Sequence, residues 1–482
     1  MSLSGALSNA ISGLTANTIG TSTLSANVAN ALNENYGRRT VNLTTNVNQS
    51  YGGVRVTQIE RFSDPVLNHQ KRLASASFAE KQTLSKFSVE FENLWGSVDT
   101  ITSMSKKLTK FETALLSASS DPSSDIRLRA VGQAADTLAN GIKSASKGVQ
   151  AVRTTADHQI ASAVDTINTQ LSQLERLNID IMSARHRGQD MLSLIDSREK
   201  ILNDLSEFIP LRVIERDSGA IAIFSNQGRT LLDVKATQFN FTKSQIIQPE
   251  MTIENGLLSD LTEINVTNSI SLENMFSGGK LSALFEVRDT IAPRSQARLD
   301  AIAREMIERF GHGGGDNTIT PGDLGVFTDA GAVFNASNEV GLASRLSLNE
   351  NLLPESNELF KWRDGLYATT IGAVGNSSLL EDIRGQILSQ RLPSSAILGL
   401  TAKTLIGHVE NFSEFIASNR NETTEATDLA RQQFDMYNQA HAKNGVNSDE
   451  ELQKLIILEK SFAANARIIQ VVDEMLTDLL QI

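Results

Sequence analysis

The segment SGGKLS, residues 277–282, is the part of the sequence that comes nearest to a phosphate-binding loop. Such a loop has an earlier glycine, four residues before its Gly-Lys pair, and a serine or threonine directly after the lysine. These groups are needed because backbone N–H groups and the hydroxyl hold the phosphates and Mg²⁺. Asn274 and Leu281 stand at those two positions. We therefore interpret the segment as a helix interrupted by a glycine turn, and we expect no nucleotide to bind there.

A second glycine-rich segment, GHGGGD at residues 311–316, lacks the third glycine of a dinucleotide fingerprint and follows a helical pattern instead of a strand. Asp316 and Asn317 do not begin a calcium loop, because Thr318 stands at a ligand position. The six histidines form no HExxH pair, and no serine lies in a GxSxG turn. The sequence therefore predicts no catalytic, cofactor-binding or metal site, and we expect the protein not to be an enzyme.

Composition and charge narrow the class of protein further. A chain of 482 residues is too long for one core, so several domains are expected. The net charge of −12 argues against nucleic acid as a partner, and the absence of cysteine excludes disulfides and thiolate-ligated metals. No lysine or arginine precedes Arg38, and no apolar run is long enough to cross a bilayer. We therefore expect neither a cleaved secretory signal nor membrane insertion.

The two ends of the sequence carry matching apolar repeats, typical of helices that pair through a heptad seam. One helix is predicted over residues 3–32, and another from Ser448, its expected N-cap, to the last residues. The predicted seam residues are Leu3, Leu7, Leu14, Asn17, Leu24 and Val28 in the first helix, and Leu455, Leu458, Phe462, Asn465, Ile469, Val472, Leu476 and Leu479 in the last.

We expect these two helices to pair antiparallel as an α-helical coiled coil. The proposed register sets Leu3 beside Leu479 and Leu24 beside Leu458, which places Asn17 opposite Asn465. A buried asparagine pair would fix the register at some cost in stability. The alternative is that both asparagines face outward from the pair.

Between the ends the pattern changes several times. Residues 39–62 are expected to form an extended segment with a turn, and residues 65–208 to be helical with breaks near 118–126, 155 and 188. Helix is expected again at 272–310 and 394–443. The fold class is therefore α+β, mainly α, with a long-helix bundle and β-rich outer insertions.

The predicted domains follow these changes of pattern. They are a coiled-coil core from 1–40 and 445–482, a helical rod domain in three parts from 41–208, 272–317 and 393–444, a β-rich insertion at 209–271, and a mixed α/β outer domain at 318–392.

The segment after the first helix, ANVANALNENYGRRTVNL, resembles the signature of bacterial flagellar rod, hook and hook-associated proteins. The matching residues are Asn27, Val28, Ala29, Asn30, Tyr36 and Arg38. Ala26, Leu32 and Asn33 depart from the signature, and Asn35 replaces a glycine while keeping access to left-handed backbone geometry. The closing helix from Gly445 is similar to that of the same family, and residues 278–293 resemble the members at the hook–filament junction.

This resemblance implies a structural protein of the flagellum. Such a protein is exported unfolded through the flagellar type III apparatus without a cleaved signal, and it assembles into a ring outside the cell. The implied partners are further copies of the chain, the hook protein, the second junction protein, and an export chaperone at the C-terminal helix. The alternative is another axial protein, flagellin-like or of the hook or rod. Because an isolated helix with polar seam residues is marginal, we also expect both ends to be disordered in the free chain and to fold on assembly.

Overall fold

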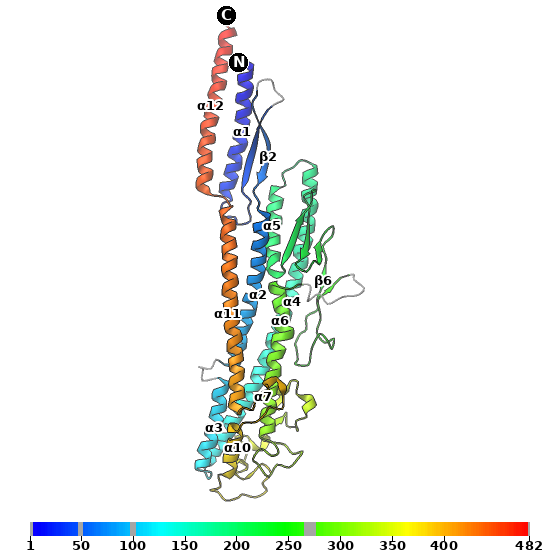
Figure 1. Ribbon diagram of the computed structural model, residues 1–482, viewed down its shortest axis with the longest axis vertical. Helices are drawn as coiled ribbons and strands as arrows, with labels where there is room; N and C mark the ends of the chain where they lie inside the picture. The colour runs from blue at the N-terminus through cyan, green and yellow to red at the C-terminus, as the bar shows by residue number, and fades with distance from the viewer. Residues whose placement is uncertain (1–2, 47–51, 97–102, 265–275, 481–482) are drawn as a thin grey trace. The chain divides into compact units, whose positions relative to one another are not determined.

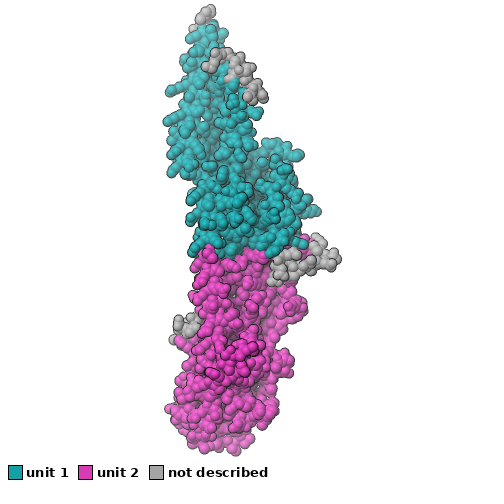
Figure 2. Space-filling model, viewed as in Figure 1, with its two compact units in different colours: residues 1–78, 167–237, 430–482 teal, residues 79–166, 238–429 magenta. Residues whose placement is uncertain are grey.

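The computed structural model describes residues 3–46, 52–96, 103–264 and 276–480. Helices dominate this part of the chain, and its strands form small antiparallel sheets (Figure 1). The predicted fold class, mainly α with β-rich additions and paired terminal helices, is thereby confirmed. The chain divides into two compact units, coloured in Figure 2: unit 1 comprises residues 1–78, 167–237 and 430–482, and unit 2 comprises residues 79–166 and 238–429.

Unit 1 contains both terminal helices, a hairpin and a three-stranded sheet. Its elements are α1 (Leu3–Ala29), β1 (Arg39–Thr45), β2 (Val54–Arg61), the start of α2 (Pro65–Trp95), the end of α4 (Asp125–His186), α5 (Leu192–Phe208), β3 (Leu211–Glu215), β4 (Ile221–Ser225), β5 (Thr230–Leu232), the end of α11 (Leu405–Lys443) and α12 (Ser448–Leu480).

Unit 2 holds the remaining parts of α2, α4 and α11 together with many shorter elements. These are α3 (Met104–Ser120), β6 (Phe239–Asn240), β7 (Thr262–Glu263), α6 (Gly279–Glu286), the π-helical turn η2 (Val287–Ile291), α7 (Ala292–Arg309), β8 (Phe327–Asp329), η3 (Ala336–Asn338), α8 (Leu342–Arg345), β9 (Leu346–Leu348), η4 (Glu350–Leu352), α9 (Lys361–Asp364), α10 (Ser378–Leu388) and η5 (Ala396–Leu398).

The core of unit 2 combines an aromatic cluster with a buried carboxylate. Phe111 lies edge-on to both Phe310 and Phe327, with ring centroids about 6 Å apart. Asp300 on α7 is almost fully buried and accepts hydrogen bonds of 2.8 Å from the backbone N–H groups of Gly341 and Ala343. Burial raises the pKa of this carboxyl to about 6, although the hydrogen bonds it accepts oppose the shift.

The β1–β2 hairpin of unit 1 follows the expected extended segment at residues 39–62. Its strands pair antiparallel from Arg39 opposite Arg61 to Thr45 opposite Val54, with one irregularity between Asn42 and Leu43. Part of the expected turn, residues 47–51, lies outside the described residues. The hairpin packs against α1, so it fixes the backbone that follows the first helix.

Two predicted helix limits in the middle of the chain are wrong. The break expected near residue 155 does not exist, because α4 continues through it while the hydroxyls of Thr154 and Thr155 bond back to carbonyls one turn earlier, at 2.8 and 3.0 Å. The helix expected from 394 begins instead at Leu405. Arg391 and Lys403 pair as an isolated β-bridge before it, and Thr404 Oγ1 accepts a 3.0 Å hydrogen bond from the N–H of Gly407.

Two further helix starts also differ from the expectation. The helix expected at 272–310 begins at Gly279 and is interrupted by η2, whereas residues 272–275 lie outside the described residues. Ser448 is the first residue of α12 and not its N-cap. Asn447 caps the helix, since its Oδ1 accepts hydrogen bonds from the N–H groups of Asp449 at 3.1 Å and Glu450 at 3.4 Å.

Candidate assembly site at the paired termini

The helices α1 and α12 lie side by side and antiparallel, so that the two chain ends are at the same end of the pair (Figure 1). Four contacts between the two helices define the register: two side-chain hydrogen bonds and two close contacts at glycines. The four agree on one register, because each step forward along α1 is matched by an equal step back along α12. These pairs are Gly13 with Asn465, Asn17 with Ser461, Gly20 with Leu458, and Asn27 with Glu451.

This register differs from the predicted one by four residues, about one turn of helix. Asn17 does not face Asn465, because its Nδ2 donates a 3.0 Å hydrogen bond to Ser461 Oγ. Asn465 instead packs on Gly13, where an added Cβ would lie 2.7 Å from its Nδ2. Leu458 likewise packs on Gly20 and not beside Leu24, since a Cβ at Gly20 would lie 2.8 Å from Leu458 Cδ1.

The buried face of α1 consists of small and polar residues, not of the leucines that dominate the apolar repeat. Its buried members are Gly5, Ala10, Ala16, Asn17, Gly20, Thr23 and Asn27. Glycine and alanine leave no bulk between two helices, so side chains of the partner helix can approach the backbone closely. The helix pair is therefore held by close approach and specific polar contacts more than by interlocking leucines.

The predicted seam residues fall into three groups by exposure. Asn17 and Val472 are buried, and Phe462, Leu476 and Leu479 are exposed in the single chain. The other predicted seam residues are half-buried: Leu3, Leu7, Leu14, Leu24, Val28, Leu455, Leu458, Asn465 and Ile469. The assignment of these residues to an assembly seam stays a prediction.

Asn27 of the family motif is fully buried where the helix pair meets the hairpin. Its Nδ2 donates to Glu451 Oε2 on α12 at 2.7 Å and to the carbonyl of Arg39 at 2.9 Å. Its Oδ1 accepts from Tyr36 OH at 2.9 Å and from the N–H of Arg39 at 3.0 Å. Both donors and both acceptor positions of the amide are thus used, which explains why the position suits asparagine and no apolar residue.

The carboxylate of Asp196 on α5 holds the loop that follows Tyr36. It accepts from the N–H of Gly37 at 3.0 Å, and it forms ion pairs with Arg39 at 3.3 Å and Arg61 at 2.7 Å. Tyr36 is itself buried beneath the Arg39 guanidinium, and burial raises the pKa of its phenol. No sequence pattern pointed to Asp196, because 159 residues separate it from Gly37 and it carries no motif of its own.

The other two motif residues act locally. Asn30 directly follows α1: its Nδ2 donates to the carbonyl of Ala26 at 2.9 Å, and its backbone N–H bonds to the same oxygen at 3.1 Å. The next backbone N–H groups bond only three residues back, Ala31 to Val28 at 3.2 Å and Asn33 to Asn30 at 2.9 Å, so α1 ends at Ala29 and not at residue 32. Arg38 lies over the ring of Phe62, 5.5 Å from its centroid. Its carbonyl accepts a 2.8 Å hydrogen bond from the N–H of Phe62, which continues the hairpin pairing.

A groove of about 330 Å³ opens between α1, β1 and α12, and its lining includes Leu24, Val41 and Ile457 together with Arg39 and Glu451. Among the residues that the structure describes, no cluster of three His, Asp or Glu side chains could hold a metal ion. Across the same described ranges, no helix combines the length and the apolar character needed to span a membrane.

Comparison with known families places the chain among the flagellar axial proteins of the rod and hook. Residues 90–316 match the model described as "Flagellar hook-associated protein FlgK helical domain", and residues 440–482 match "Flagellar basal body rod FlgEFG protein C-terminal". The second match includes all of α12, so both compact units contain matched residues.

Two relatives that align with most or all of this chain have the same name. Flagellar hook-associated protein 1 of Bacillus subtilis is 23% identical over 499 residues, covering 94% of this chain and 93% of the relative. That of Escherichia coli is 22% identical over 559 residues, covering 100% of both chains. The chain belongs to the family of flagellar hook-associated protein 1.

A solved structure, that of the flagellar hook junction protein FlgK from Burkholderia pseudomallei, resembles part of the chain. The TM-score is 0.45 at 19% identity, and the match covers 54% of this chain and 46% of that chain.

Proposed function

We propose that this chain is a structural subunit of the bacterial flagellum that assembles at the junction between hook and filament. The relatives named flagellar hook-associated protein 1 support this role, because they align with almost the whole chain. The observation in the structure that carries the proposal is the number of large apolar side chains that α12 leaves exposed. That helix meets small residues of α1, and many of its apolar side chains remain uncovered, some of them beside the grooves between the two helices.

The uncovered residues of α12 are all exposed by 41% or more. They are Leu452, Ile456, Ile457, Phe462, Ile468, Val471, Met475, Leu476, Leu479 and Leu480. Exposed large apolar side chains in this number on one helix are typical of a protein–protein contact. Each such side chain contributes about 1.5–3 kcal/mol once it is buried, so a few of them are enough to hold a neighbouring subunit.

The similarity to flagellar hook-associated proteins suggests which chains cover these side chains. Further copies of the chain would form a ring, with the hook protein on one side and the second junction protein on the other. Before assembly, an export chaperone would cover the exposed apolar side chains of α12, and the chain would pass through the flagellar type III apparatus without a cleaved signal. In this role the chain acts outside the cell, without catalysis and without a cofactor.

A gene deletion tests the role and separates it from its alternative, another flagellar axial protein. Loss of a junction protein leaves hooks without filaments and releases flagellin into the medium, which electron microscopy and an immunoassay of the medium detect. Loss of a rod or hook protein leaves no complete hooks, and loss of a flagellin leaves no flagellin to release. Normal filaments in the deletion strain would contradict the proposal.

Complementation then tests the surface itself. The double variant Ile457→Ser with Phe462→Ser should be exported and folded but fail to restore filaments, because two exposed apolar side chains of α12 are lost. Val234→Ser is the matched control, since Val234 is 79% exposed in unit 1 but lies outside α12. Equal restoration of filaments by both variants would exclude these two side chains of α12 from the contact.

A further inference from the structure

Three asparagine–glycine pairs occur in the sequence, at Asn140–Gly141, Asn255–Gly256 and Asn444–Gly445. Asparagine is among the chemically least durable residues. It is least durable before glycine, because a residue without Cβ leaves its backbone nitrogen open to the side-chain carbonyl of the asparagine. The three pairs are equivalent in an unfolded chain, so any difference between them in the folded protein comes from the structure.

Two of the pairs lie in unit 2, and hydrogen bonds hold their asparagine side chains. Asn140 lies within α4, where its Nδ2 donates a 2.9 Å hydrogen bond to Asp136 Oδ1. Asn255 lies in a loop, where its Nδ2 donates to the carbonyl of Glu250 at 2.7 Å and its Oδ1 accepts from two backbone N–H groups of the same loop at 3.1 and 3.2 Å. The Cγ atom of either asparagine can turn toward the next backbone nitrogen only after these bonds break.

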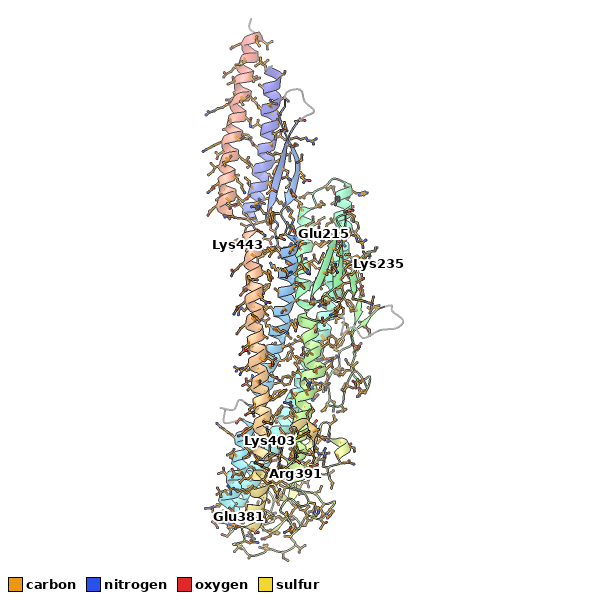
Figure 3. All side chains as sticks on the ribbon, viewed as in Figure 1. Glu215, Lys235, Glu381, Arg391, Lys403 and Lys443 are labelled. Carbon is orange, nitrogen blue, oxygen red and sulfur yellow. The ribbon has the colours of Figure 1, made fainter. Side chains whose placement is uncertain are left out.

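The third pair forms the turn between α11 and α12, directly after Lys443, which Figure 3 labels at the end of α11. Asn444 is half-buried, and among the described residues its side-chain amide makes no hydrogen bond. The backbone N–H of Gly445 donates to the carbonyl of Ala442 at 3.0 Å. The turn therefore fixes the backbone at this pair but leaves the asparagine side chain unrestrained.

The loop at Asn255 provides a close comparison. The N–H of Gly256 also donates at 3.0 Å to the carbonyl three residues earlier, that of Ile253, so the backbone restraint on the glycine nitrogen is the same in both turns. Asn255 is the more exposed of the two asparagines. Exposure alone would therefore select Asn255 as the more reactive residue, whereas the hydrogen bonds of the side chains select Asn444.

We propose that Asn444 is the site at which the folded chain deamidates. The nitrogen of Gly445 gives its proton to water or hydroxide and attacks Asn444 Cγ, so that a C–N bond forms. Nδ2 takes up a proton and leaves as ammonia, and the product is a cyclic imide. Water then opens the imide: attack at Cγ leaves an aspartyl residue, and attack at the backbone carbonyl leaves an isoaspartyl link. No atom is oxidised or reduced in these steps.

The surroundings of the turn supply the water and determine the consequence. A cavity of about 30 Å³, room enough for a water molecule, is lined by Asn444, Gly445 and His441 among others. Both products place a new negative charge in the turn. The isoaspartyl link also adds one carbon to the backbone path, which moves the Gly445 nitrogen away from the carbonyl of Ala442. The turn that determines where α12 begins is thereby loosened as the protein ages.

The experiment follows all three pairs in one sample of the full chain by peptide mass spectrometry. The chain is incubated in buffer made with ¹⁸O-water, because opening of the imide incorporates the label and distinguishes this reaction from deamidation during digestion. A parallel sample in urea should show similar rates at the three pairs. In the folded chain, Asn444 should react at least about tenfold faster than Asn255, which must first break several hydrogen bonds, and Asn140 should also be slow. Equal rates in the folded chain, or a faster reaction at Asn255 or Asn140, would overturn the proposal.

Two matched variants check the assignment. Asn444→Gln should remove most of the label taken up by the folded chain, because glutamine must close a larger ring, whereas Asn255→Gln should leave the uptake unchanged. Persistent uptake in Asn444→Gln contradicts the proposal. The expected order holds even if α12 opens in the free chain, since Asn444 has no side-chain hydrogen bond to lose and the other two pairs lie in unit 2.

Discussion

Asn27 offers the sharpest test of how the terminal helices are held. Its side chain joins α1 to Glu451 on α12, and to Tyr36 and the backbone of Arg39 beyond the helix. Asn27→Ala removes four hydrogen bonds in a fully buried position while keeping a residue that favours helix. The loss therefore reports on the network and not on helix propensity.

The structure sets the size of the expected effect. Three of the four bonds join neutral groups and contribute about 1 kcal/mol each, whereas the bond to the carboxylate of Glu451 contributes about 1.5–3 kcal/mol. The sum of about 5 kcal/mol is an upper value, because Glu451 and Arg39 also line the neighbouring groove and water can enter from there. We expect Asn27→Ala to destabilise the helix pair by about 3–4 kcal/mol.

Amide hydrogen exchange measured by mass spectrometry is the suitable assay, because the protection of α1 and α12 peptides gives their free energy of opening. It is applied to the free chain and to assembled protein, since the sequence predicts that the terminal helices form only on assembly. Asn30→Ala is the matched control, because its side chain makes one local bond, and we expect a loss below about 1 kcal/mol. The reasoning is refuted if both variants open equally easily wherever the wild-type helices are protected.

Two further predictions concern a packing contact and a titration. Gly13→Ala gains about 1 kcal/mol in helix propensity, but its Cβ would lie 2.7 Å from Asn465 Nδ2, so the side chain of Asn465 must shift and part of the gain is lost. Hydrogen exchange checks this, and Gly385→Ala, where a Cβ meets nothing within 4 Å, should stabilise its helix by the full amount. The pKa of Asp300, about 6 in the fold against an ordinary 3.8, means that its contribution is complete below pH 4 and is lost as pH rises through 6. The unfolding free energy of the wild-type protein should therefore fall by about 3 kcal/mol from pH 4 to 7, after the change seen in the Asp300→Asn variant over the same range is subtracted. Urea titrations of both proteins at each pH measure this difference.

The sequence predicts the pairing of the ends correctly but not the contacts that hold them. Apolar repeats mark which residues of a helix favour burial, and those at both termini correctly indicated two long helices that meet. They do not mark Gly13 or Gly20, because glycine has no side chain to contribute to a hydrophobic pattern. Yet these positions set the register, since Asn465 and Leu458 pack directly against them. A register predicted from the positions of leucines therefore places α12 about one helical turn away from where it lies in the structure.

The network around Tyr36 shows a different limit of sequence reasoning. The motif residues can be recognised in the sequence because they are clustered within a short stretch of chain. Asp196 and Glu451 complete the same network from distant segments, and each has the sequence surroundings of an ordinary helical carboxylate. Only the fold brings them to Asn27 and Gly37, so no local pattern could have selected them among the other acidic residues.

The residue types at the contact between α1 and α12 bear on why the pair is built this way. A seam filled with leucines would bury the large apolar side chains within one chain and leave a polar surface outside. Here glycine, alanine and asparagine of α1 form the inner contact, while residues such as Phe462 and Met475 remain exposed. The contact within the chain is then set by close approach and specific polar pairs, and the exposed apolar side chains of α12 are left for other chains. A helix pair of this composition gains further stability when a neighbour covers those side chains, as expected of a subunit that completes its folding when it assembles.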